Sequence, residues 1–161
     1  MDPESYGMMD TAEDGPSGPR AEYPESLLAQ VRAACQIPAI QGQVFIAIHE
    51  CCEPLGSHDF MILGIYSTLN SANSAALDLF KREYEFFFAC NHHMSRWVER
   101  RPHAPHIPCS LDEWESGGVY DDGKPGNTVL WEVHNGAVSL RALVGDEGDA
   151  YHVYVERYTV Q

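Results

Sequence analysis

The chain has 161 residues, 44% of them hydrophobic and 21% charged, a balance that indicates a single globular domain with a core to bury. Its formal net charge of −14 argues against binding to nucleic acid or to an anionic membrane, and favours a protein partner with a basic surface. The absence of a long apolar run and of a secretory signal, together with an odd count of five cysteines, predicts a cytoplasmic or nuclear protein without a disulfide framework.

The N-terminal part of the chain is predicted to have no fixed structure. Residues 1–23 hold glycines and prolines among acidic and small polar side chains, so we expect a disordered acidic tail. Residues 24–161 then form one domain. Its first element is a short helix over Pro24 to Cys35, which either packs on the domain or serves as a docking segment.

A hairpin and a long helix follow in the predicted order. Gln43 to Cys51 and Asp59 to Tyr66 are rich in β-branched and aromatic residues, which predicts two strands joined by a turn. Ser67 or Thr68 can cap the helix that comes next. Its apolar positions recur at steps of three and four residues: Leu69, Ala72, Ala76, Leu79, Phe80 and Phe87.

The next part of the chain is predicted to be an irregular insertion at residues 91–126. Prolines exclude a regular helix from Asn91 to Pro108, and Ser110 with Glu113 forms a capping-box pattern that opens a short helical turn.

Three strands are predicted to close the domain. Thr128 to His134 and Ala137 to Val144 flank Asn135 and Gly136, a pair typical of a type I′ hairpin turn, and Ala150 to Val160 forms the last strand. The order strand, strand, helix, then three strands predicts an α+β fold: an antiparallel sheet of about five strands with one long helix on one face.

Three of these segments together resemble small uncharacterised proteins of filamentous fungi. They are VFIAIHE, FMILGIYSTLNSANSAAL and VYVERYTV, which cover roughly residues 43–85 and 150–160. The resemblance implies a strand, a capped helix entry and a closing strand. It implies no activity.

Histidines and cysteines recur in groups that could suit zinc, which prefers thiolate and imidazole ligands. The groups are His49, Cys51 and Cys52; Cys90, His92 and His93; and His103, His106 and Cys109. There is no C-x-x-C pair, and the alternative is that Cys90 is a small buried hydrophobe and the histidines of the insertion are solvated. We therefore expect no metal and no cofactor.

An acid/base site could combine His49 and Glu50 with His134 or His152, because strand ends can converge on a cleft. However, adjacent residues of a strand point to opposite faces, and neither a nucleophile motif nor a phosphate-binding loop is present. The alternative is that these histidines are half-buried strand residues with local partners. Whether the protein is an enzyme stays open, and a non-catalytic role is preferred.

A basic and aromatic patch stands out in the otherwise acidic chain: Arg96, Trp97, Arg100, Arg101, His103 and His106. A helical turn over Ser95 to Glu99 would place Arg96 and Arg100 on one face and suit an acidic partner. The alternative is a solvated loop whose arginines pair with the domain's own carboxylates.

The sequence therefore predicts a non-catalytic protein-interaction domain or a subunit of a complex. It would present the insertion or a sheet edge to a protein partner, and an edge could also join copies of the chain into a homo-oligomer. The alternatives are a small enzyme or ligand-binding protein with a cleft lined by His and Glu, or a zinc-binding domain.

Overall fold

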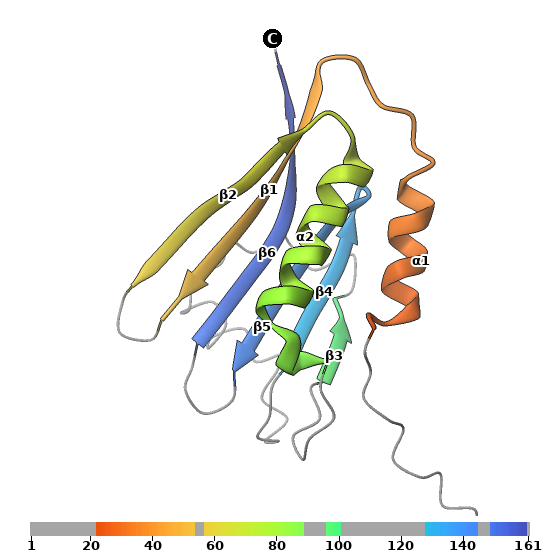
Figure 1. Ribbon diagram of the computed structural model, residues 1–161. Coiled ribbons are helices and arrows are strands. Elements are labelled where there is room, and N and C mark those ends of the chain that lie inside the picture. Colours follow the sequence, from red (N-terminus) through yellow and green to blue (C-terminus); the bar gives the residue numbers. More distant parts are fainter. Residues whose placement is uncertain (1–21, 54–56, 89–95, 101–127, 145–148, 161) are drawn as a thin grey trace, which may run out of the picture.

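The computed structural model describes residues 22–53, 57–88, 96–100, 128–144 and 149–160. These residues form one six-stranded sheet and two α-helices, which confirms the α+β prediction (Figure 1). The sheet has one strand more than predicted, and the short first helix lies in the fold beside the one long helix that was predicted to cover the sheet. The elements are α1 Glu25–Ala34, β1 Gln43–Cys52, β2 His58–Tyr66, α2 Leu69–Glu83, the 3-10 helix η1 Glu85–Phe87, β3 Arg96–Glu99, β4 Thr128–His134, β5 Ala137–Val144 and β6 Asp149–Thr159.

The strand order in the sheet is β2-β1-β6-β5-β4-β3. The last strand of the chain thus lies between β1 and β5, in the middle of the sheet. All neighbouring pairs are antiparallel except β3 and β4, which run parallel. This arrangement leaves β2 and β3 as the two edges of the described sheet.

Strand β3 corrects the prediction of an irregular segment and of a helical turn ending at Glu99. Arg96–Glu99 is extended and pairs in register with Thr128 to Trp131 of β4. Four residues are too few to show strand periodicity, and the partner strand comes about thirty residues later in the chain, so the pairing is a tertiary effect. The other predicted parts of the insertion, residues 91–95 and 101–126, lie outside the described residues.

Local signals at the other elements behave as expected. The Thr68 side chain accepts a hydrogen bond from the backbone N–H of Ser71 at 3.2 Å and so caps α2. Asn135 and Gly136 have φ values of 49° and 85°, which the type I′ turn between β4 and β5 requires. These signals depend only on neighbouring residues.

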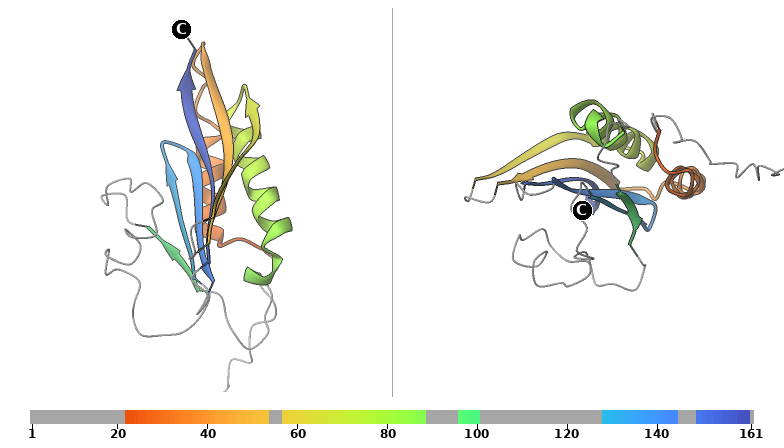
Figure 2. Two further views of the ribbon diagram at one scale, coloured as in Figure 1. Left: turned by 90° about the vertical axis from the view of Figure 1, so that its left-hand side faces the viewer. Right: turned by 90° about the horizontal axis from the view of Figure 1, so that it is seen from below.

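Both helices lie on the same side of the sheet (Figure 2). Helix α2 packs over β1 and β6, and α1 packs beside it toward β4 and β5. Helix α1 buries Leu27, Val31 and Ala34, so of the two alternatives for this helix it packs on the domain. None of the helices in the described ranges is long and apolar enough to cross a membrane.

The core lies between this helical layer and the facing side chains of the sheet. Its largest fully buried members include Phe80 of α2, Leu140 of β5 and Val153 of β6. Tyr23, which the sequence places in the tail, belongs to the domain: its hydroxyl donates to the Leu77 carbonyl at 2.5 Å. Residues 1–21 of the predicted tail lie outside the described residues.

Candidate functional site

Two members of the predicted basic and aromatic patch are held by the domain itself. The Trp97 ring faces the helical layer, with its centroid 5.2 Å from that of Phe88 and 5.7 Å from that of Tyr23. The side chain of Arg100 is 8% exposed, and its Nη1 atom lies 3.5 Å from the Glu132 carboxylate. Arg100 thus pairs with a carboxylate of its own domain. This pairing is the one expected from the sequence as the alternative to a binding patch.

The remaining members of the patch provide no further geometry. Arg96 lies in β3, and Arg101, His103 and His106 lie outside the described residues. Because Arg96 lies on a strand, the helical spacing that would align it with Arg100 does not exist. A binding role for these six residues stays a prediction.

The proposed zinc ligands do not form a site within the described part of the chain, where no group of three or more His, Cys, Asp or Glu side chains could hold a metal ion. His49 and Cys51 share the helix face of β1, and Cys52 is buried on the other face. The other candidates, Cys90, His92, His93, His103, His106 and Cys109, lie outside the described residues.

A small polar cluster lies where β1 meets the end of α2. The Nε2 atom of His49 is hydrogen-bonded to the Tyr84 hydroxyl, and the Cys51 Sγ atom lies 3.4 Å from the same Nε2. The rings of Tyr84 and Tyr151 are 4.6 Å apart and pack the cluster from the β6 side. The result is a thiol beside an imidazole, an arrangement that a nucleophile could use.

The electrostatics of this cluster argue against a reactive thiolate. Burial lowers the pKa of His49 and raises the pKa of Cys51, with Asp59 and Glu53 adding to the increase at the thiol. Both shifts favour the neutral form of each group. A thiol is activated by the opposite pattern, in which a positive neighbour stabilises the thiolate.

The opposite face of the sheet carries a row of hydrogen-bonded polar side chains. Tyr154 donates to Glu50 at 2.5 Å, and its ring stacks on that of His152 with centroids 4.1 Å apart. The His152 Nε2 atom lies 2.8 Å from the Ser139 hydroxyl and 3.4 Å from Arg141 Nε. Because an arginine can only donate, this Nε2 atom is an acceptor, so the Ser139 hydroxyl donates to it as well.

This row brings together part of the acid/base site expected from the sequence. Glu50 and His152 are cross-strand neighbours on one face, whereas His49 faces the helices and His134 is exposed at the end of β4. Ser139 and His152 are buried, at 9% and 3% exposure. A serine with so little exposure is not placed to reach a substrate, and the row satisfies buried polar groups.

The most exposed apolar surface in the described part of the sheet lies on edge strand β2. Phe60, Ile62 and Ile65 are 54%, 52% and 66% exposed, and the register places all three on the face opposite the helices. We call these three residues the β2 surface. Ile62 stands beside the buried Ile48 of β1, and Ile65 stands beside the half-buried Ile46.

Sequence reasoning located β2 as a strand but missed its surface. The run from Phe60 to Ile65 is apolar throughout, which is typical of a strand covered on both sides. Its exposure follows from its place at the edge of the sheet, on the face that α1 and α2 do not cover. In the sequence, the only indication of this exposed apolar surface is a strand whose residues are apolar without alternating with polar ones.

Comparisons with protein-family models, with curated proteins and with solved structures found no match to this chain.

Proposed function

We propose that the protein is a non-catalytic interaction domain that takes an extended segment of a partner protein onto edge strand β2. The β2 surface, which lies on a strand paired on one side only among the described strands, carries this proposal. An edge strand presents unpaired N–H and C=O groups that a second strand can use, and neighbouring side chains then select the partner.

The composition of β2 supports this role. Edges of sheets are commonly protected by lysine, proline or an inward-pointing charge, yet His58–Tyr66 holds no lysine, arginine or proline, and Asp59 is its one carboxylate. The register with β1 shifts between Ala47 and Ile48, which leaves Leu63 as an extra residue. The longest regular stretch for pairing is therefore His58 to Ile62.

Charge selects a basic partner over a second copy of the chain. Exposed carboxylates of Glu53 and Asp59 stand at the His58 end of the strand, and the chain as a whole carries a net charge of −14. Two copies would repel each other, whereas a segment with lysine or arginine beside its apolar residues would be attracted. The partner segment is thus extended, apolar on alternate residues and basic.

The non-catalytic part of the proposal is supported by the two polar clusters. The thiol and imidazole of Cys51 and His49 favour their neutral forms, and Ser139 is buried. Thiols at Cys35 and Cys51 suit the reducing cytoplasm or nucleus, the compartments that we propose for the protein.

The test is binding of a nine-residue peptide that alternates valine and lysine, measured by fluorescence anisotropy over a range of salt concentrations. Ile62→Ser with Ile65→Ser should weaken binding about 10- to 100-fold, because two half-exposed isoleucines lose roughly the burial of one full side chain. Ile37→Ser with Ile40→Ser is the matched control, since these isoleucines are 52% and 60% exposed and belong to the segment between α1 and β1, outside β2. That pair should bind as the unchanged protein does.

Three results would contradict the proposal. The first is absence of saturable binding, and the second is an equal effect of the two isoleucine pairs. The third is equally tight binding of a peptide with glutamate in place of lysine. Sedimentation of the protein alone tests the choice of occupant: a dimer that Ile62→Ser and Ile65→Ser abolish would replace the basic partner with a second copy of the chain.

A further inference from the structure

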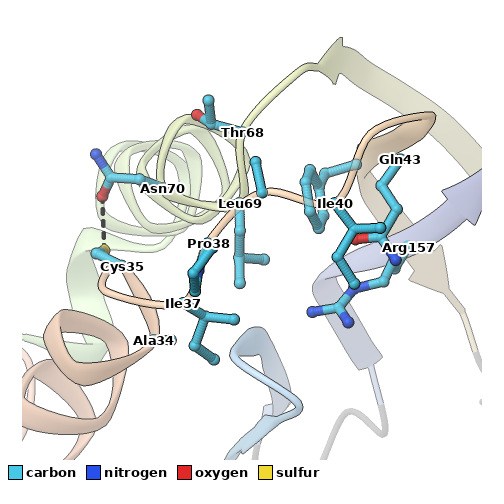
Figure 3. A pocket seen from close by; sticks show the side chains of 12 residues that line it. Ala34, Cys35, Ile37, Pro38, Ile40, Gln43, Thr68, Leu69, Asn70 and Arg157 are labelled. Carbon is cyan, nitrogen blue, oxygen red and sulfur yellow. Dashed lines mark hydrogen bonds between the residues drawn. The ribbon is translucent and has the colours of Figure 1, made fainter.

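A pocket of about 310 Å³ opens between the end of α1 and the beginning of α2, on the helix side of the sheet (Figure 3). Ala34 closes α1 on one side, Thr68 and Leu69 begin α2 on the other, and the segment between α1 and β1 runs along the rim. Arg157 reaches the pocket from β6. Four separate elements therefore meet here.

The described lining is neutral apart from one cation, and it includes the polar side chains of Gln43, Thr68 and Asn70. Its apolar members include Ile37, Pro38, Ile40 and Leu69, and the described lining holds no aspartate or glutamate. Ile37 and Ile40 are 52% and 60% exposed, so the pocket has apolar walls that face solvent. In a chain with a net charge of −14, a pocket whose single charge is positive selects against cations and favours an anion.

Arg157 is held in position by its surroundings. Its guanidinium carbon lies 5.6 Å from the centre of the Phe45 ring, and its Nη2 atom donates to the Asn135 carbonyl at 2.8 Å. That carbonyl belongs to the type I′ turn between β4 and β5. None of the described carboxylates forms an ion pair with Arg157. A guanidinium has five N–H donors, so it retains donors for a ligand.

We propose that this pocket binds a small monocarboxylate with an apolar body. The body lies against Ile37, Pro38 and Leu69, and the carboxylate lies at the rim against the Arg157 guanidinium, whose planar fork matches its two oxygens. Apolar burial supplies the affinity and the single ion pair orients the ligand, as in most small-molecule sites.

The size of the pocket and its single cation define the ligand further. At the ~30 Å³ that a water molecule occupies in the liquid, the pocket holds about ten non-hydrogen atoms, the number in octanoate. A phosphate or a dicarboxylate would bring a second charge into a pocket whose described lining has Arg157 as its single cation. A neutral alcohol of the same length would leave the guanidinium unused.

The experiment is calorimetric titration of the full chain with octanoate, 1-octanol and acetate. Octanoate should bind at one site, 1-octanol more weakly and acetate not measurably. Arg157→Gln should weaken octanoate binding about 10- to 100-fold, the worth of one hydrogen-bonded charge. Arg82→Gln is the matched control because Arg82 is an exposed arginine of α2 whose carboxylate neighbour is Glu83.

A second variant tests the walls without changing the charge. Ala39 is exposed and lines the pocket, so Ala39→Trp should fill the space, prevent octanoate binding and leave the melting temperature unchanged. Ile62→Ser with Ile65→Ser reports on adventitious binding to the β2 surface and should have no effect on octanoate. The proposal is overturned if octanoate shows no saturable binding, if octanol binds as tightly, or if Arg157→Gln and Ala39→Trp both bind as the unchanged protein does.

Discussion

Asn73 of α2 is a fully buried polar residue in the interface between that helix and the β4–β5 hairpin, and its replacement should destabilise the protein strongly. Its Nδ2 atom donates to the Gly136 carbonyl at 2.8 Å, and its Oδ1 atom accepts from the Val138 backbone N–H at 3.1 Å. One side chain thus satisfies a donor and an acceptor of the sheet. It also fixes the hairpin turn against the helix.

The cost of Asn73→Ala follows from those two groups. Alanine leaves the Val138 N–H and the Gly136 carbonyl buried without their partner, and each such group costs about 1 to 3 kcal/mol. The expected loss in the free energy of unfolding is therefore about 2 to 6 kcal/mol. Asn70→Ala is the control, because Asn70 is exposed on the same helix, where its side chain accepts one bond, from the Cys35 thiol.

Urea unfolding followed by circular dichroism measures both variants. Alanine has a higher helix propensity than asparagine by up to about 0.7 kcal/mol, and this gain is shared by the two substitutions, so their difference isolates the buried hydrogen bonds. Asn70→Ala should change the free energy of unfolding by no more than about 0.5 kcal/mol. If Asn73→Ala is no more destabilising than Asn70→Ala, the two hydrogen bonds do not stabilise the hairpin and the reasoning is refuted.

Three further outcomes are expected. Trp97→Ala should lower the free energy of unfolding, measured in urea, by about 3 kcal/mol because the ring packs against the core. A variant as stable as the unchanged protein would contradict this packing of Trp97. Deletion of residues 1–21 should leave the melting temperature within a few degrees, whereas Tyr23→Ala should cost about 2 kcal/mol; equal effects would contradict the packing of Tyr23. Because burial lowers the pKa of folded His49, the unfolded chain binds its proton more readily, so stability should fall as the pH drops below about 6.5, and His49→Gln should reduce that slope in pH-dependent melting.

The elements that depend on neighbouring residues could be read from the sequence. The strands over Thr128–His134 and Ala137–Val144 were predicted with the bounds that the structure has, because Asn135 and Gly136 specify the turn that joins them. The capped helix after Thr68 and the strand before it carry equally local signals. In each case the residues that specify the periodicity, the cap or the turn are only a few positions apart in the sequence.

The candidate sites depend on contacts between distant parts of the chain. Among the described strands β2 pairs with β1 alone, which makes it an edge, and Phe60, Ile62 and Ile65 lie exposed on its face opposite the helices. Strand β3 forms by pairing with β4, which turns Trp97 toward the core. No sequence pattern within β2 or β3 indicates these contacts with distant strands.

The sequence by itself determined the acidic charge, the α+β class and the local signals for caps, turns and most strands, because composition and short-range periodicity are properties of the chain alone. Only the tertiary structure decided which side chains are accessible. Arg157 and Phe45 are separated by more than a hundred residues, yet the pairing of β1 with β6 brings the guanidinium over the ring at the pocket. Arg100, similar in sequence context to a surface arginine, is instead buried against Glu132, since burial is decided by what packs over a residue.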